Sequence, residues 1–149
     1  MKKISKIDLA YTAGIIDGEG CIKIYKVNAE TINRPNNRYV LNVQVSMVTK
    51  EVVRWFYKKY LGYLYLDKIN TYKHPNWRDR QRWMLQNQKC KLFLEQILPY
   101  LKTKKYQAKL ALKFLQISPG DIKSKHKFWK KMAKLNKTGR FIKEQNNGN

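Results

Sequence analysis

The most informative stretch of the sequence is residues 12–20, which read TAGIIDGEG. It continues the run IDLAYTAGII of residues 7–16, which has helical composition and contains no proline. Ser5 or Asp8 is a suitable residue to cap the start of this helix. We expect the helix to end within the segment DGEG, residues 17–20, because two closely spaced glycines stop a helix.

Small residues line one side of this predicted helix, and acidic residues lie at its end. Ala10, Ala13 and Gly14 are three or four positions apart, so they are predicted to share a face that a second helix can approach closely. Glu19 is poorly placed for stability, because the helix macrodipole disfavours a carboxylate at the C-terminal end. A divalent cation such as Mg²⁺, which prefers carboxylate and carbonyl oxygens, would remove this conflict.

Two such helices, related by a two-fold axis, would bring their Glu19 carboxylates together. Metal ions held there could activate a water molecule and stabilise the leaving oxygen of a phosphodiester. In an arbitrary protein the segment Asp17-Gly18-Glu19-Gly20 is usually only a polar turn, so this interpretation depends on the surrounding elements.

The rest of the chain predicts an α+β fold with the order αββαββα. Residues 21–27 and 39–47 alternate apolar and polar side chains and predict a half-buried antiparallel hairpin, with a turn-rich segment at 28–37 between them. Four strands and segregated helices favour an antiparallel sheet with helices on one face. The remaining predicted elements are a helix at 49–61, strands at 62–69 and 78–85 around a turn at 70–77, and helices at 89–101 and 105–117.

The length of 149 residues fits one domain better than two. We expect its core to cover about residues 7–117. A break at Pro119-Gly120 separates this core from a basic tail at about 121–149, which contains a weak helical stretch around KFWKKMAKL.

The charge is +22, from 32 basic and 10 acidic residues, and it predicts a polyanionic partner. Nucleic acid is the usual polyanion, because each phosphate that a protein neutralises releases a counterion. An anionic membrane is the rival, but it would require an amphipathic helix with a clean apolar face. Residues 76–149 carry a net +15 of this charge.

Several classes of protein are excluded or disfavoured by the composition. No stretch approaches the roughly 20 apolar residues of a membrane span, and the N-terminus lacks a secretory cleavage pattern. Cys21 and Cys90 make neither a disulfide framework nor a zinc site. We therefore expect a soluble, intracellular protein without a small-molecule cofactor.

One face of the predicted sheet is polar and basic, which excludes it from a core. Such a face can simply be solvated, but long polar side chains on an antiparallel ribbon also read base edges in a DNA major groove. The net charge favours DNA contact. The predicted DNA-binding residues are Lys23, Tyr25, Asn42, Gln44, Arg78, Arg80 and Arg82.

Residues 12–20 resemble the LAGLIDADG motif of homing endonucleases, whose usual variants read AGxxDGEG or AGxxDGDG. The segment AGIIDGEG matches the core of the motif, and Thr12 stands where leucine is usual. The element order, the strand VQVS at 43–46 and the segment PYLKTKKYQA at 99–108 also resemble the single-motif members. The resemblance spans about residues 7–117.

This resemblance implies a homodimer, joined through the motif helix, that cuts both strands of a long pseudo-palindromic DNA site and leaves short 3′ overhangs. It implies Mg²⁺ or Mn²⁺, with Glu19 as metal ligand and the Gly18 carbonyl as a second ligand. Asp17 matches a structural acid, and Lys104 matches a basic residue beside the scissile phosphate. Met47 stands where glutamine or asparagine is common, and it cannot perform that role.

Two alternatives remain at this point. An RNA-splicing maturase or a catalytically weakened DNA-binding relative would keep the fold without needing Glu19. A structural nucleic-acid binder would explain the charge. It would not explain a helix that has small residues on one face and two acidic residues at its end. The target sequence and the host genome, whether phage, bacterial or organellar, do not follow from the residues.

Overall fold

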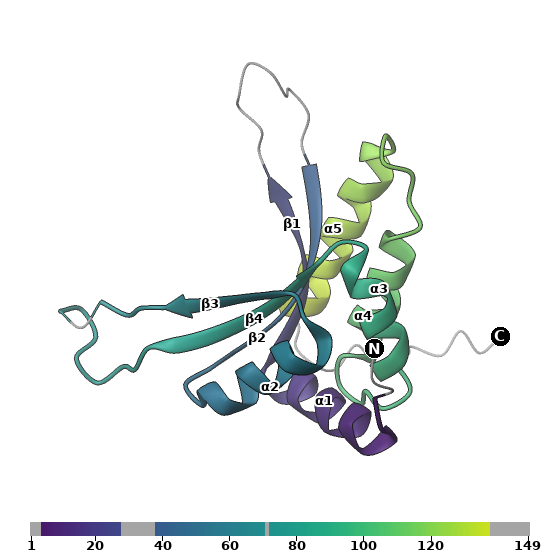
Figure 1. Ribbon diagram of the computed structural model, residues 1–149. Coiled ribbons are helices and arrows are strands. Elements are labelled where there is room, and N and C mark those ends of the chain that lie inside the picture. The colour runs from purple at the N-terminus through teal and green to yellow at the C-terminus, as the bar shows by residue number, and fades with distance from the viewer. Residues whose placement is uncertain (1–3, 28–37, 71, 138–149) are drawn as a thin grey trace.

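The computed structural model describes residues 4–27, 38–70 and 72–137, and it confirms the α+β class and the order αββαββα, followed by one more helix (Figure 1). The predicted turn at 28–37 and the end of the predicted tail lie outside the described residues. In chain order the elements are α1 (Lys6–Glu19), β1 (Gly20–Val27), β2 (Arg38–Met47), α2 (Lys50–Tyr60), β3 (Tyr63–Asp67), β4 (Arg80–Gln86), α3 (Lys89–Ile97), α4 (Lys105–Phe114) and α5 (Ile122–Lys137).

The four strands form one antiparallel sheet in the order β1-β2-β4-β3. Lys23 pairs with Asn42 between β1 and β2, and Trp83 of β4 lies opposite both Val45 and Leu64. Because side chains alternate along a strand, this register separates an apolar face from a polar one.

The helices cover the apolar face, and the core lies between them and the sheet (Figure 1). Trp83 is fully buried there, with its ring centroid 5.0 Å from that of Phe56 on α2 and 5.2 Å from that of Phe93 on α3. The opposite face of the sheet, which we call the outer face, carries the polar strand residues. None of the helices in the described ranges combines the length and apolar character needed to cross a membrane.

Several predicted boundaries were wrong by a few residues. The end of helix α1 at Glu19, by contrast, lies within the predicted segment 17–20, and the Gly20 N–H caps the carbonyls of Ile15 and Ile16. Helix α3 ends at Ile97, two residues before Pro99, since a proline has no N–H with which to continue the helical hydrogen bonds. Strand β4 begins at Arg80 rather than at Arg78.

The C-terminal helix α5 is longer and better anchored than the weak helical stretch that the sequence predicts. It has 16 residues, and Met132 is fully buried in the core. The Tyr39 hydroxyl lies 2.7 Å from His126 Nδ1, and the Asn136 side-chain amide donates to the Ile22 carbonyl at 3.1 Å. Helix α5 therefore packs against the β1 side of the sheet.

Candidate nucleic-acid interface and acidic helix end

Helix α1 passes into strand β1 without an intervening loop. This junction requires glycine at position 20, because a Cβ there would lie 2.7 Å from Ile16 Cα and 2.8 Å from the Ile16 carbonyl oxygen. The backbone at Gly20 is ordinary extended backbone, with φ −81°, so close approach and not conformation is the reason for glycine. The junction thereby fixes where Glu19 leaves the helix.

Asp17 ties the end of α1 to the segment that precedes α4. Its carboxylate accepts hydrogen bonds from the backbone N–H groups of Lys102 at 2.7 Å and Lys104 at 2.9 Å. It also accepts from the N–H of Thr103 at 3.2 Å and from the hydroxyl of Thr103 at 3.0 Å. Burial alone would raise the pKa of Asp17, but these hydrogen bonds outweigh it and hold the pKa below its ordinary value.

The side chain of Lys104 in turn donates hydrogen bonds to the end of α1. Its Nζ donates to the carbonyl oxygens of Ile16 at 2.9 Å and Asp17 at 2.7 Å, which belong to the last turn of α1. A cation there complements the negative end of the helix macrodipole. We call these mutual contacts of Asp17 and Lys104 the α1–α4 clasp. The clasp holds a positive charge at the same helix end that carries Glu19.

Glu19 and Gly18 are exposed at the end of α1. A Cβ on Gly18 would meet no atom within 4 Å, so the backbone here is open to approach from outside. Among the residues that the structure describes, no three histidine, cysteine or acidic side chains are grouped closely enough to hold a metal ion. One carboxylate and one carbonyl suit a hard divalent cation, but a complete ligand set needs oxygens from a second chain or from a bound phosphate.

Cys21 follows this site directly and is half-buried. Burial raises the pKa of its thiol, while the charges of Lys23 and Lys104 act to lower it. Lys104 is therefore close enough to the start of β1 to affect the electrostatics there.

The outer face of the sheet carries six of the seven residues that were predicted to bind DNA. The register pairs Lys23 of β1 with Asn42 of β2, and the period of two puts Tyr25 and Gln44 on the same face. A groove of about 780 Å³ lies over this face. Its lining includes Tyr25, Arg38, Asn42, Gln44, Arg82 and Gln86. Arg38 and Gln86 were missed in the sequence, although continuing the period of two along β2 and β4 identifies both.

Three of the predicted contact residues have surroundings that the sequence did not predict. Arg78 precedes β4, so it does not extend the arginine row of the strand. Asn42 is only 4% exposed, and its amide donates to the sulfur of Met84, because it pairs at the centre of the sheet. Arg82 forms an ion pair with Asp67 at 2.8 Å, and its guanidinium lies 5.4 Å from the Tyr65 ring centroid.

Some polar atoms in the groove have no hydrogen-bond partner within the described part of the chain. They are Asn42 Oδ1, Gln44 Oε1 and Arg82 Nε, each shielded from solvent. Buried polar groups are normally paired, and leaving one unpaired costs about 1–3 kcal/mol. A ligand that reorients these side chains would recover part of that free energy.

The small residues of α1 do not all share one face, which corrects the prediction for Ala13. Ala13 is fully buried in the core, together with Thr12 and Ile16, so it faces its own sheet. Ala10 and Gly14 are exposed on the other side of the helix, and a Cβ on Gly14 would meet no atom within 4 Å.

Large apolar side chains flank these two small residues. Ile7 is 82% exposed and Tyr11 is 47% exposed. The outward face of α1 is therefore apolar, small at its centre and uncovered within the described part of the chain.

Thr12 and Met47, the two departures from the motif pattern, have ordinary structural environments. The Thr12 hydroxyl lies 2.6 Å from the Tyr60 hydroxyl and donates to the Asp8 carbonyl at 2.7 Å. Met47 is partly buried and packs against the core at the end of β2. Neither residue presents a polar group toward Glu19.

No family model matches the sequence, and no curated protein matches it either. Among solved structures, the homing endonuclease I-CvuI, crystallised with DNA and Mg, superposes with a TM-score of 0.70 at 22% identity, covering 93% of this chain and 85% of that one. The archaeal intron-encoded homing endonuclease I-Vdi141I, complexed with DNA, gives 0.68 at 16% identity, covering 86% and 83%.

A third match is the LAGLIDADG homing endonuclease I-SmaMI bound to cleaved DNA. It gives a TM-score of 0.67 at 15% identity, covering 89% of this chain but 47% of that one. The chain therefore has the fold of LAGLIDADG homing endonucleases, and the resemblance seen in the sequence is confirmed at the level of the fold.

Proposed function

We propose that the chain is a homodimeric, site-specific DNA endonuclease of the homing type. It hydrolyses both strands of a long pseudo-palindromic site in the presence of Mg²⁺ or Mn²⁺ and leaves short 3′ overhangs. The observation that carries this proposal is the exposed Glu19 at the end of α1, the same helix end at which the α1–α4 clasp holds the Lys104 ammonium group. A solvated polar turn would have no need of this arrangement.

The outward face of α1 supports the homodimer. Gly14 has an ordinary helical environment with open space around it, so nothing in the described part of the chain explains a residue that costs about 1 kcal/mol in a helix. A second helix packed closely on Ala10 and Gly14 explains it. Pairing there also covers Ile7 and Tyr11 and brings the two Glu19 carboxylates near a common axis.

DNA as the substrate is supported by the charge and by the groove on the outer face. The solved neighbours I-CvuI and I-Vdi141I were crystallised with DNA. Exposed basic and amide side chains on antiparallel strands suit a major groove, in which arginine and lysine pair with guanine and glutamine pairs with adenine. Lys23, Gln44 and Arg80 are the residues that we assign to this contact, with phosphate contacts fixing the register.

The residues around Glu19 have separable tasks in the proposed reaction. Glu19 and the Gly18 carbonyl would hold the divalent cation, which when bound acidifies a water molecule and stabilises charge on the phosphodiester oxygens. Lys104 adds positive charge beside the phosphate, and Asp17 acts as a positioning residue that keeps the Lys104 backbone fixed.

The test is cleavage of a library of long random duplexes in Mg²⁺, followed by sequencing of the cut ends. We expect one long sequence to be cut with a fixed stagger. Glu19→Gln should bind that sequence without cutting it. Glu95→Gln, which removes the same charge from the exposed surface of α3, is the matched control and should cut normally. Normal cutting by Glu19→Gln would refute the role of Glu19.

The dimer is tested with Gly14→Leu, which fits the isolated chain but blocks close approach of a second helix. By sedimentation equilibrium we expect a folded monomer, with cleavage lost. Ala133→Leu, which adds the same kind of bulk to an exposed position of α5, should remain dimeric. A dimeric Gly14→Leu would exclude this interface.

The second candidate is an RNA-splicing maturase or a catalytically weakened DNA-binding relative, and Met47 is the observation that favours it. Its partly buried side chain offers no hydrogen bond where the resemblance implies glutamine or asparagine. Retention of one DNA or RNA sequence without cutting, in Mg²⁺ and in Mn²⁺, would support this candidate. A gain of cleavage in Met47→Gln would then identify position 47 as the cause.

A further inference from the structure

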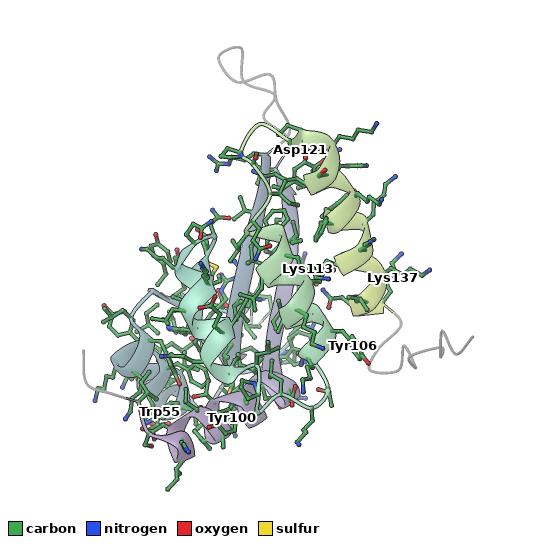
Figure 2. All side chains as sticks on the ribbon, turned by 90° about the vertical axis from the view of Figure 1, so that its right-hand side faces the viewer. Trp55, Tyr100, Tyr106, Lys113, Asp121 and Lys137 are labelled. Atoms are coloured by element: carbon green, nitrogen blue, oxygen red, sulfur yellow. The ribbon has the colours of Figure 1, made fainter. Side chains whose placement is uncertain are left out.

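A second strongly basic surface lies on the helices that cover the sheet. Figure 2 shows α4 and α5 side by side in front of the sheet, with Lys113 and Lys137 on the side away from it. Of the eight exposed residues of α5, six are lysines that form a row along the helix, and the other two are Ala133 and Asn136. We call this row, together with Lys109 and Lys113 of α4, the back surface. The row consists of Lys123, Lys127, Lys130, Lys131, Lys134 and Lys137.

The back surface has one sign of charge over its whole length. Residues 102–137 contain twelve lysines and a single acidic residue, Asp121. The Asp121 carboxylate accepts from the Ser124 N–H at 3.0 Å at the start of α5. Like charges at positions i and i+4 of a helix repel each other, as Lys123 and Lys127 do. A merely solvated helix face normally mixes the two signs, so this repulsion indicates an anionic ligand.

The apolar side of α5 is already used, which argues against a membrane. Met132 is fully buried, and Phe128 and Trp129 pack against the core. Tyr106 of α4 is 42% exposed, and Lys109 Nζ lies 6.0 Å from its ring centroid. Membrane-bound amphipathic helices need a free apolar face to insert, and the back surface offers lysine side chains instead.

The duplex that we assign to the groove does not reach the back surface. The groove lies on the outer face of the sheet, whereas α4 and α5 pack on the opposite face. A helix with its side chains is about 10–12 Å across, so the sheet and a full helical layer separate the two surfaces. The back surface therefore has a ligand of its own.

We propose that the back surface binds the phosphate backbone of a second DNA duplex without reading its bases. Lysine is a compact point charge suited to phosphate, and the row lacks the arginine, asparagine and glutamine side chains that read base edges. Single-stranded RNA is normally recognised by aromatic stacking platforms, and Tyr106 is the one large exposed aromatic of α4 and α5. The choice of DNA over double-stranded RNA rests on the proposed function, since DNA is the polymer on which this protein would act.

Two DNA surfaces on opposite sides would let the protein hold two duplexes at once. A protein bound non-specifically could then pass from one duplex to another without full release, which is useful for finding a rare site among many non-specific ones.

The experiment compares two triple variants of the full chain with the wild type, all in EDTA so that cleavage plays no part. The back variant carries Lys113→Gln, Lys127→Gln and Lys130→Gln. The matched sheet variant carries Lys23→Gln, Arg38→Gln and Arg80→Gln. One 30-bp duplex of arbitrary sequence is fixed to beads, and a second, dye-labelled duplex reports bridging.

We expect the wild type to retain the labelled duplex and the back variant to retain at least tenfold less, while it still binds the beads. The sheet variant should still bind a single duplex. In the proposed dimer its plot of log affinity against log salt should be shallower than that of the wild type by about 5.4, at about 0.9 for each of the six lost contacts, three in each protomer. Equal bridging by the back variant and the wild type would overturn the proposal.

Competition identifies the ligand. If single- or double-stranded RNA of equal length abolishes bridging at a lower concentration than unlabelled DNA does, the back surface is an RNA site and the assignment to DNA is wrong. If the sheet variant binds a single duplex as well as the wild type does, while the back variant loses binding, the proposed function of the sheet fails but this inference stands.

Discussion

Replacing Asp17 with asparagine breaks one half of the α1–α4 clasp while keeping the shape of the side chain. In the native protein, Oδ2 accepts from the Lys102 N–H at 2.7 Å, and Oδ1 accepts from Thr103 and from the Lys104 N–H. Asparagine keeps one acceptor oxygen and turns its NH₂ group toward the Lys102 N–H. One hydrogen bond is lost, and the others lose their ionic character.

The size of the effect follows from these bonds. A hydrogen bond to a charged group contributes about 1.5–3 kcal/mol and a neutral one about 0.5–1.5 kcal/mol. Because the carboxylate is partly exposed, solvent screening places the expected loss at the lower end, at about 2 kcal/mol. For a chain of this size, 1 kcal/mol corresponds to about 2–4 °C in Tm, so the Tm should fall by about 4–8 °C.

The pH dependence gives the sign of the electrostatic contribution. The folded-state pKa of Asp17 lies below the ordinary value of 3.8, so its charge stabilises the fold above that value. The stabilisation is lost as the pH falls through the lower, folded-state pKa. The difference in Tm between wild type and Asp17→Asn should therefore be constant near neutral pH and shrink below pH 3.8.

Thermal unfolding followed by circular dichroism measures both quantities. Glu95→Gln is the control, and as a surface change it should shift the free energy of unfolding by no more than about 0.5 kcal/mol. A Tm for Asp17→Asn that matches the wild type at pH 7, or a difference that persists unchanged in acid, would show that the clasp does not stabilise the fold.

Three further predictions concern the motif and the core. Gly20→Ala should lower the free energy of unfolding by about 1–3 kcal/mol in urea titrations, because its Cβ would meet the Ile16 backbone at 2.7 Å. Thr12→Val should cost about 1–2 kcal/mol, since it removes the partner of the Tyr60 hydroxyl, and adding Tyr60→Phe should cost less than the sum of the two changes. Burial raises the pKa of the Cys90 thiol to about 12, so a thiol reagent at pH 8 should modify it only after denaturation. Rapid modification of Cys90 in the folded protein would contradict its buried environment.

The local pattern of the sequence predicts the elements well, but it does not predict the partners that long-range packing creates. The alternation in β1 and β2 correctly places Lys23 and Gln44 on the outer face, because a period of two leaves little choice. The clasp joins residues 87 positions apart, and no local signal connects Asp17 with the Lys104 N–H. The Asp67–Arg82 ion pair likewise depends on the register between β3 and β4, which the sequence does not specify.

Ala13 shows a different limit. Alanine is compatible with a core and with a helix–helix contact, so the spacing of Ala10, Ala13 and Gly14 does not reveal which side each residue faces. Larger neighbours decide it, since Ile16 is buried three positions after Ala13 and brings that side of α1 onto the sheet. A helical plot that weighs Ile16 against the exposed Tyr11 would separate Ala13 from the other two.

The direct passage from α1 into β1 has a geometric consequence for any pair of these chains. Flexible linkers let two binding modules adjust their separation to targets of different length. Here Glu19 ends the helix and Gly20 begins the strand, so no linker residue lies between a contact at α1 and the groove beside β1. In a dimer formed through α1, the spacing between the two grooves would be set by the angle at a single glycine. The dimer would then bind only targets whose two half-sites have one fixed separation. A target with one base pair inserted at its centre would not be bound, even where every recognised base is kept.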